Sequence, residues 1–399
     1  MKITALETLR VQEFPNLLWV FVETEDGLRG CGESFFIAPA TEAYLHDTAA
    51  QLLLGQDARD REAIQRRLHP YVGYNGAGAE VRGNSAIDMA LWDLWGRYLD
   101  QPVWRLLGGR CRERIRTYNT CAGYKYVRGS VGQLTENWGL GGDEGPYEDL
   151  DGFLTDAGKV AESLLSQGIT GMKIWPFDFA AEASHGAAIT PDQLAEAVEP
   201  FAKIRRAVGS EMQIMAEMHL LWQPHALAEI ARALEPYDIY WIEDPMPATA
   251  PSSWADLRAR VRPKIAGSET MATRAAFRSF MEAGALDVVI MDLGWCGGLT
   301  EAKAIANMAD AFHLPIAPHD CTGPLAWAAC THLTLNAPNA LVQESVRAFY
   351  SGWYGELAEN LPVVEDGHIH LPEGTGMITA LKQEVFDRPD ATIRRTERD

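Results

Sequence analysis

The sequence lacks a long uninterrupted apolar run. Its most apolar stretches, such as NLLWVFV at residues 16–22, are interrupted within a few positions, whereas a membrane-spanning helix needs roughly 20 apolar residues. No basic segment of the kind found in secretory signals precedes these stretches. These absences argue against a membrane protein, and we expect a cytoplasmic one.

Cysteine is also scarce, and the cysteines are scattered. The chain contains six, at positions 31, 111, 121, 296, 321 and 330, without any C-x-x-C pair. Neither a disulfide scaffold nor a zinc site of the knuckle type fits that spacing. We expect reduced thiols.

Positive charge is the third shortage. The chain carries 35 lysines and arginines against 55 acidic residues, a formal net charge of −20. Such a charge repels nucleic acid and anionic membranes, so neither is expected as a partner. It would also repel a carboxylate substrate unless the site carries its own positive charge, which a metal cation would supply.

The chain shows two different secondary-structure patterns along its length. Residues 1–115 combine alternating, β-type segments and a DG turn signal at 26–27 with helical segments, which predicts an α+β unit. From residue 116 onward, short apolar runs alternate with longer amphipathic stretches. The eight predicted strands are 116–121, 171–175, 213–217, 239–243, 264–269, 286–292, 314–319 and 340–344. Eight strands alternating with helices predict an α/β fold with a closed parallel barrel.

Ionisable residues stand at the ends of seven consecutive predicted strands. They are Lys173, Glu217, Glu243, Glu269, Asp292, His319 and Glu344. The steps from Glu217 onward are 26, 26, 23, 27 and 25 residues, about the length of one strand, one helix and two loops. Any one of them alone would pass as a surface charge. A set that recurs after buried strands predicts an active site at the carboxyl-terminal rim of the barrel.

The residue types at these strand ends suggest their roles. Glu217, Glu243 and Glu269 offer three carboxylates from neighbouring strands, a ligand set that favours Mg²⁺, or alternatively Mn²⁺, over zinc. The next two strands pair Asp292 with His319, as a carboxylate orients an imidazole that acts as a general base.

Two further residues of the set add to this site. Lys173 supplies fixed positive charge. Glu344 either donates a hydrogen bond in its protonated form or positions its neighbours when ionised, and the sequence leaves both possibilities open.

Several motifs are similar to one known family. They are SAIDMALWDLWGRYLDQPVWRLLGG, YWIEDP, AGSET, MDLGWCGGLTEA, PHDCTGP and QES, in that order over nearly the whole chain. Together they resemble the mandelate racemase-like branch of the enolase superfamily. The resemblance implies a modified (β/α)7β barrel at 116–345, capped by residues 1–115 together with 346–399. It also implies Mg²⁺ at the three glutamates, the Asp292–His319 base, and Glu344 near the substrate carboxylate.

The sequence departs from the racemase pattern at two strands. Racemase-like members often carry K-x-K on the second strand, but Trp175 stands where the second lysine, an opposing base, would be. On the third strand, Glu217-Met218-His219 resembles the acidic-x-His pattern of galactonate and mannonate dehydratases, whose histidine acts as an acid toward the leaving hydroxyl. Here the acidic member is Glu instead of Asp. A packed or solvated His219 without a catalytic role is the alternative.

These features predict dehydration of a sugar acid, an aldonate or an aldarate, to a 2-keto-3-deoxy acid. A racemase, epimerase or cycloisomerase on the same scaffold and a non-catalytic sugar-acid-binding protein remain the alternatives. The expected partners are a small-molecule sugar acid and further copies of the chain in a homo-oligomer.

Three features bear on substrate specificity. The glycine-rich stretch 124–148 follows the first barrel strand, where binding loops lie, and its Lys125 and Arg128 either meet a distal carboxylate or are surface cations. The segment 72–80 is a possible covering loop. Three tryptophans follow strand ends and either stack on sugar faces or pack the barrel: Trp175, Trp222 and Trp295.

Overall fold

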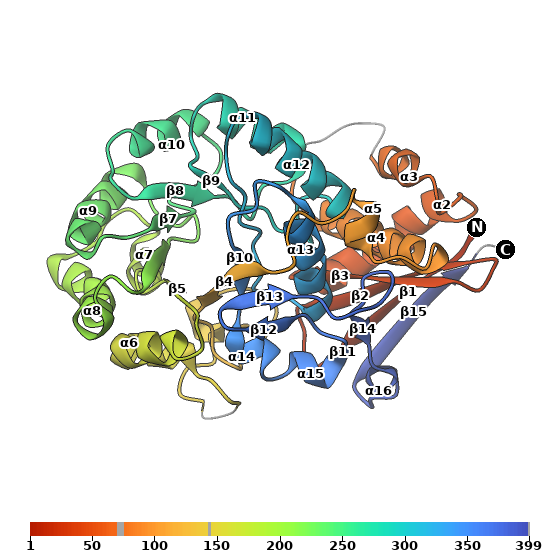
Figure 1. The fold of residues 1–399 in the computed structure, drawn as a ribbon, viewed down its shortest axis with the longest axis horizontal. Helices are drawn as coiled ribbons and strands as arrows, with labels where there is room; N and C mark the ends of the chain where they lie inside the picture. The colour runs from red at the N-terminus through yellow and green to blue at the C-terminus, as the bar shows by residue number, and fades with distance from the viewer. Residues whose placement is uncertain (70–75, 143–144, 398–399) are drawn as a thin grey trace.

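The two ends of the chain build one antiparallel sheet. β1 (Ile3–Val11), β2 (Leu17–Thr24) and β3 (Arg29–Phe35) are adjacent, and β15 (Ala391–Glu397) pairs with β1 on the other side. The predicted turn at 26–27 is confirmed, since Gly27 joins β2 to β3 with a φ of 75°. The computed structural model describes residues 1–69, 76–142 and 145–397, and Figure 1 shows this sheet to one side of the barrel.

Helices cover one face of this sheet. They are α1 (Ala38–Tyr44), η1 (Leu45–Ala49), α2 (Ala50–Leu53), α3 (Arg61–Leu68), α4 (Ala79–Tyr98) and α5 (Val103–Leu106). α4 lies directly against β3 because two strand residues are glycines. A Cβ at Gly30 would lie 2.0 Å from the carbonyl oxygen of Ala90, and one at Gly32 would lie 1.9 Å from that of Ala86. The two glycines therefore fix how closely sheet and helix approach.

The middle of the chain forms the parallel barrel. Its assigned strands are β4 (Ile115–Thr120), β5 (Gly171–Ile174), β6 (Gln213–Glu217), β7 (Trp241–Glu243), β8 (Lys264–Gly267), β9 (Val288–Val289) and β10 (Gln343–Ser345). Neighbours from β4 to β9 pair in parallel, and β10 closes the ring by pairing with β4. Between β9 and β10, Ile316 bridges Val289 on one side and Ala340 on the other. It occupies the place of the seventh strand.

A helical layer surrounds the strands (Figure 1). It consists of α6 (Asp149–Leu165), α7 (Asp178–Ser184), α8 (Pro191–Val208), α9 (Pro224–Leu234), η3 (Glu235–Tyr237), α10 (Pro251–Arg258), α11 (Thr273–Glu282), α12 (Leu299–Ala311) and α13 (Pro324–Asn336). Every barrel strand except the last is followed by a helix before the next strand. The fold is therefore the modified (β/α)7β barrel with an α+β capping domain that the sequence predicts.

Two of the predicted strands are shorter than expected. The run 286–292 contains only β9, and the run 314–319 contributes only the bridge at Ile316. The backbone nevertheless continues in register, because the amide of Ala317 donates to Val289 (3.0 Å) and that of His319 donates to Met291 (3.0 Å). The extended path thus reaches the barrel mouth although the regular ladder ends earlier.

The C-terminal segment contacts both parts of the molecule. Its elements are α14 (Arg347–Tyr350), α15 (Tyr354–Leu357), β11 (Ala358–Glu359), β12 (Val363–Glu365), β13 (His368–His370), β14 (Ala380–Leu381), α16 (Gln383–Phe386) and β15. β15 extends the N-terminal sheet, whereas β13 pairs antiparallel with barrel strand β4. We propose 1–115, 116–345 and 346–399 as the domain limits.

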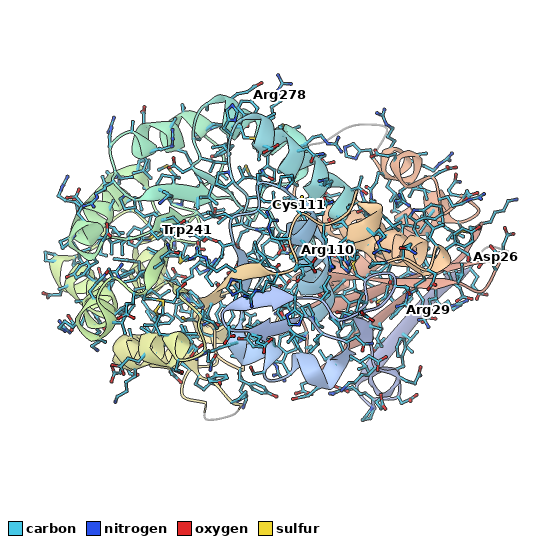
Figure 2. The ribbon with its side chains drawn as sticks, in the orientation of Figure 1. Asp26, Arg29, Arg110, Cys111, Trp241 and Arg278 are labelled. Carbon is cyan, nitrogen blue, oxygen red and sulfur yellow. The ribbon has the colours of Figure 1, made fainter. Side chains whose placement is uncertain are left out.

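The barrel interior beneath the mouth is a layer of fully buried, mostly apolar side chains. Tyr118, Met215, Trp241, Ala266, Val288, Ile290, Ala317 and Val342 form this cluster, each with 0% exposure. Figure 2 shows Trp241 among the barrel strands and Arg278 projecting outward from α11. Within the described residues, no helix is both long and apolar enough to cross a membrane.

Candidate active site

The structure brings the seven predicted strand-end residues together. Lys173, Glu217, Glu243 and Glu344 lie within β5, β6, β7 and β10, while Glu269, Asp292 and His319 follow the next strands within a few residues. Each is buried, with at most 6% of its surface exposed. Buried charges need partners, so the contacts of these groups define the site.

Three glutamates form a compact carboxylate cluster. One carboxylate oxygen each from Glu217, Glu243 and Glu269 lies within 4.8 Å of the other two. Burial raises the pKa of Glu243 well above its ordinary value, and burial also raises that of Glu269. Oε2 of Glu217 is buried and, within the described part of the chain, has the Lys173 ammonium at 3.2 Å but no hydrogen bond. A crowded, oxygen-only ligand set fits a hard divalent cation.

Lys173 contacts two carboxylates of this cluster and that of Glu344. Its Nζ lies 2.6 Å from Oε1 of Glu243, 2.9 Å from Oε1 of Glu344 and 3.2 Å from Oε2 of Glu217. Glu344 also accepts hydrogen bonds from Thr120 Oγ1 and from the amide of Asp320. Burial opposes ionisation of Glu344, but Lys173, His319 and the hydrogen bond from Thr120 together outweigh it and lower the pKa of that carboxyl. The structure therefore favours an ionised Glu344.

His319 and Asp292 form a hydrogen-bonded pair. Nδ1 of His319 lies 2.7 Å from Oδ2 of Asp292, whose Oδ1 accepts the amide of Gly294 at 2.6 Å. Nε2 of His319 lies 3.1 Å from Oε2 of Glu269. Burial opposes a charge on this imidazole, but Glu269, Glu344 and Asp292 raise its pKa well above the ordinary value. With Nδ1 held by Asp292, Nε2 is the atom available to a substrate.

A second histidine–aspartate pair lies beside the first. Nδ1 of His219 is 2.7 Å from Oδ2 of Asp178, which opens α7. The amide of His219 donates to Oε1 of Glu217 (2.8 Å), and its backbone has a φ of 48°. Burial opposes protonation of His219, but Asp178 and Glu217 outweigh it and raise its pKa to about 9. An imidazole that is protonated at neutral pH can donate a proton.

Sequence reasoning missed Asp178. It is the first residue of α7 and lies beyond the end of β5, so the spacing of the strand ends does not include it. The sequence did contain one local signal for Asp178. It follows Trp175-Pro176-Phe177 and begins a helix, a position where acidic residues are favoured. That signal alone does not point to His219.

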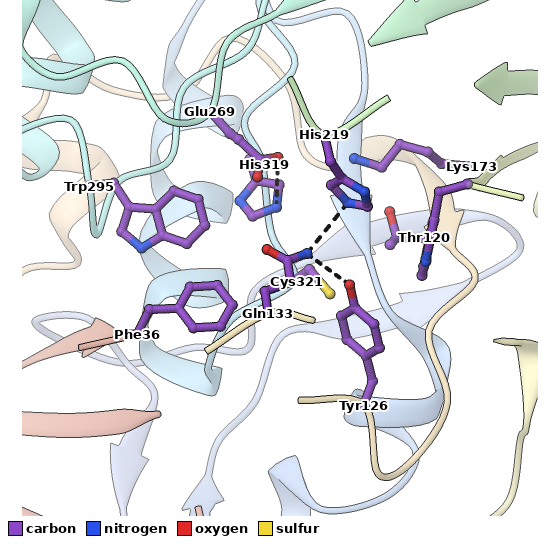
Figure 3. A pocket seen from close by; sticks show the side chains of 11 residues that line it. Phe36, Thr120, Tyr126, Gln133, Lys173, His219, Glu269, Trp295, His319 and Cys321 are labelled. Atoms are coloured by element: carbon purple, nitrogen blue, oxygen red, sulfur yellow. Dashed lines mark hydrogen bonds and ion pairs between the residues drawn. The ribbon is translucent and has the colours of Figure 1, made fainter. Parts of the chain in front are cut away.

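Both histidines line one small cavity at the barrel mouth. Figure 3 shows its walls, and the lining residues are Phe36, Thr120, Tyr126, Gln133, Lys173, Trp175, His219, Glu269, Trp295, His319 and Cys321. Phe36 follows β3, so the N-terminal half contributes to the site. The stretch 124–148, which includes η2 (Thr135–Asn137), contributes Tyr126 and Gln133.

Gln133 links this stretch to the acid candidate. Its Nε2 donates to Tyr126 Oη at 2.8 Å and lies 3.5 Å from Nε2 of His219 (Figure 3). Arg128 of the same stretch instead pairs with Glu13 and covers the ring of Phe14 at 4.3 Å. It therefore contacts the N-terminal domain, and neither Arg128 nor Lys125 is among the lining residues of the cavity.

Of the other residues expected to affect substrate specificity, some line the cavity and some do not. Trp175 and Trp295 line the cavity, whereas Trp222 is fully buried and is not among the lining residues. Of the expected covering segment 72–80, residues 72–75 lie outside the described residues. Gly76 and Ala77 line a different hollow, together with Leu220.

Comparisons with known proteins agree with the fold. Residues 3–108 match the N-terminal domain model of the mandelate racemase / muconate lactonizing enzyme family, and residues 156–385 match the enolase C-terminal domain-like model. D-galactonate dehydratase from Ralstonia nicotianae is 32% identical over 384 residues, covering 94% of this chain and 91% of that protein.

Solved structures are similar over the whole chain. An enolase of the mandelate racemase subgroup from Agrobacterium tumefaciens has 45% identity and a TM-score of 0.88, covering 100% of this chain and 99% of that one. An enolase protein from Sargasso Sea environmental sequencing has 41% identity and a TM-score of 0.88 with the same coverage. The chain therefore belongs to the mandelate racemase / muconate lactonizing enzyme family of the enolase superfamily.

Proposed function

We propose that this protein is a Mg²⁺-dependent sugar-acid dehydratase that converts an aldonate or aldarate to a 2-keto-3-deoxy acid. One observation carries the proposal: the histidines of two histidine–aspartate pairs line the same cavity, together with Glu269 of the three-carboxylate cluster. One pair suits a base and the other an acid, and dehydration needs both. The similarity to D-galactonate dehydratase supports the same reaction class.

The three glutamates Glu217, Glu243 and Glu269 would hold the cation. Bound there, Mg²⁺ would act as a Lewis acid that stabilises negative charge on the substrate carboxylate. Lys173 supplies a fixed positive charge in the same place. Without such stabilisation, the proton beside a carboxylate is too weakly acidic to be removed at a useful rate.

Proton removal falls to His319. Its Nε2 takes the C2 proton, while Asp292 holds Nδ1 and stabilises the imidazolium that forms. The electron pair of the broken C–H bond moves onto the carboxylate group as an enediolate. Neutral His319 is required for this step, so substrate and cation must offset the charge that Glu269 and Glu344 place beside it.

Departure of the hydroxyl falls to His219. As the enediolate collapses, the C3–O bond breaks and protonated His219 delivers a proton to the leaving oxygen, so that water departs. Asp178 holds the imidazole and compensates its charge before the transfer. The resulting enol tautomerises to the 2-keto-3-deoxy acid, and the substrate has lost one water in total.

A screen of sugar acids in D₂O tests this proposal. The purified protein with Mg²⁺ would be incubated with aldonates and aldarates that differ in hydroxyl configuration, and followed by proton NMR and a semicarbazide assay for keto acid. The proposal expects keto acid from at least one of them. Recovery of substrate that is deuterated and inverted at C2 without keto acid would identify an epimerase instead. Binding without exchange or product would indicate a non-catalytic protein.

A further inference from the structure

Two buried carboxylates of the N-terminal domain reach into the barrel. Glu33, on β3, has 0% exposure and accepts the amides of Ala326 (3.0 Å) and Leu325 (3.4 Å) in the first turn of α13. Asp88, on α4, also has 0% exposure and accepts the amide and the hydroxyl of Thr300 in the first turn of α12 (2.8 and 2.6 Å). Each carboxylate thus satisfies helix N–H groups that have no partner within the helix.

The contact of Glu33 with α13 and that of Asp88 with α12 have the same geometry at the start of the helix. Neither helix has a capping side chain of its own, because the residue before each is a glycine, Gly298 for α12 and Gly323 for α13. A Cβ at Gly323 would lie 2.3 Å from a carboxylate oxygen of Glu33, and one at Gly298 would lie 2.5 Å from Cβ of Asp88. The glycines leave the space that the carboxylates from the other domain occupy.

α12 and α13 are the two helices that follow Asp292 and His319, the partner of the proposed general base and the base itself. α12 begins at Leu299, shortly after Asp292, and α13 begins at Pro324, shortly after His319. The N-terminal domain also holds the first connecting segment directly, since Ser85 Oγ accepts the amide of Gly297 at 3.0 Å. The three glutamates of the carboxylate cluster lie on or after β6, β7 and β8.

We propose that Glu33 and Asp88 are positioning residues that set the orientation of the Asp292–His319 pair for removal of the C2 proton. The role rests on the proposed function of His319 as the base. Each carboxylate fixes the start of a helix, and each helix start fixes the short segment that presents one member of the pair. Loss of either contact therefore misplaces the base while the cation site stays intact.

Glu33→Gln and Asp88→Asn test the role, because each keeps the shape of the side chain and removes its charge. We expect kcat for C2 exchange in D₂O and for keto-acid formation to fall together by about tenfold to hundredfold, as small misplacements of reacting groups do. KM and the Kd for Mg²⁺, measured by calorimetry, should stay within about twofold. If Asp88→Asn does not fold, Thr300→Val removes one of its two contacts and should lower exchange to a smaller extent.

Asp93→Asn is the matched control. Asp93 lies on the same helix as Asp88, is 1% exposed, and accepts the amides of Cys31 and Met377 instead of a barrel helix. It should lower stability and leave kcat for exchange unchanged. Exchange at the wild-type rate in Glu33→Gln and Asp88→Asn, or an equal loss in Asp93→Asn, would overturn the positioning role. A wild-type protein that neither exchanges nor dehydrates any sugar acid would overturn the proposed function itself, and this role with it.

Discussion

Lys173 balances the charge of the site at the scale of single residues. Its ammonium contacts Glu217, Glu243 and Glu344 at 3.2 Å or less, and all four groups are buried. One lysine cannot neutralise the three carboxylates it contacts together with Glu269 nearby. The residual negative charge is what a divalent cation would offset, and it leads to the first prediction.

Removing one carboxylate should weaken cation binding. In Glu243→Gln or Glu269→Gln, we expect the Kd for Mg²⁺ to rise by more than about hundredfold, since even groups behind the ligands typically change affinity by 10–100-fold. Calorimetric titration measures the Kd, and circular dichroism checks that the barrel stays folded. Wild-type turnover in excess EDTA would contradict the metal assignment.

Loss of the base should stop both observable reactions. In His319→Asn, C2 exchange and keto-acid formation should each fall by about 10²–10⁴-fold, the usual contribution of a positioned general base. Asp292→Asn should lose a large part of both, because Asp292 holds the ring at 2.7 Å. NMR in D₂O follows exchange directly, and normal exchange in His319→Asn would assign the base elsewhere.

Loss of the acid should separate the two reactions. Because His219 acts after the enediolate has formed, His219→Asn should make little keto acid and still exchange the C2 proton in D₂O, and Asp178→Asn should show the same pattern more weakly. The ratio of exchange to dehydration measures the separation. Dehydration by His219→Asn at the wild-type rate would exclude His219 as the acid.

At the scale of elements, the contact between β3 and α4 depends on two small residues. Gly32→Ala would place a methyl group 1.9 Å from the backbone oxygen of Ala86, and backbone cannot move aside as a side chain can. We expect this change to lower the free energy of unfolding by about 1–3 kcal/mol or more. Gly355→Ala is the control, because nothing lies within 4 Å of its added Cβ. Urea denaturation of both variants measures the difference, and equal midpoints would contradict the close-contact argument.

Apolar runs and the residues that follow them were enough to predict the strands. The run IYWIE contains β7 and ends at Glu243, and QIMAE coincides with β6 and ends at Glu217. A buried parallel strand must be apolar along its length, so a charged residue at its end is conspicuous in the sequence. The run LPIAPH predicted a full strand, but only Ile316 pairs with neighbouring strands there. The backbone of this run still extends to the barrel mouth, so the position of His319 was predicted although the strand was not regular.

Contacts between distant segments could not be predicted in this way. Asp178, at the start of α7, and Gln133, in the stretch 124–148, both contact His219. Phe36, which lines the same cavity, comes from the N-terminal half of the chain. None of these residues stands at a periodic position, and their proximity depends on how loops pack across the barrel mouth. Glu33 and Asp88 were missed for the same reason, because the partners of each lie more than 200 residues away in the barrel.

At the scale of the whole molecule, α13 is also tied to the segments that flank the barrel. His332 in this helix has 0% exposure; its Nδ1 accepts the amide of Trp104 at 3.0 Å, and its Nε2 donates to the carbonyl of Met377 at 3.0 Å. Trp104 belongs to α5 and Met377 to the C-terminal segment, so one imidazole joins three parts of the chain. The bonding pattern requires an acceptor at Nδ1, which only the neutral ring provides.

This imidazole should make folding stability depend on pH. Burial lowers the pKa of His332 to about 4 from an ordinary value of 6.5. The unfolded chain therefore binds the proton more readily, so the stabilisation is complete above pH 6.5 and is lost as pH falls through this window toward 4. Between pH 7.5 and 5.5, the loss of unfolding free energy from this one group amounts to about 1 kcal/mol.

In His332→Gln, whose amide can replace both hydrogen bonds without titrating, that part of the pH dependence should disappear. Urea midpoints at the two pH values measure it, with His225→Gln as the control because the side chain of His225 is exposed. A loss of stability between pH 7.5 and 5.5 in His332→Gln as large as in the wild type would show that His332 does not couple the three segments to pH.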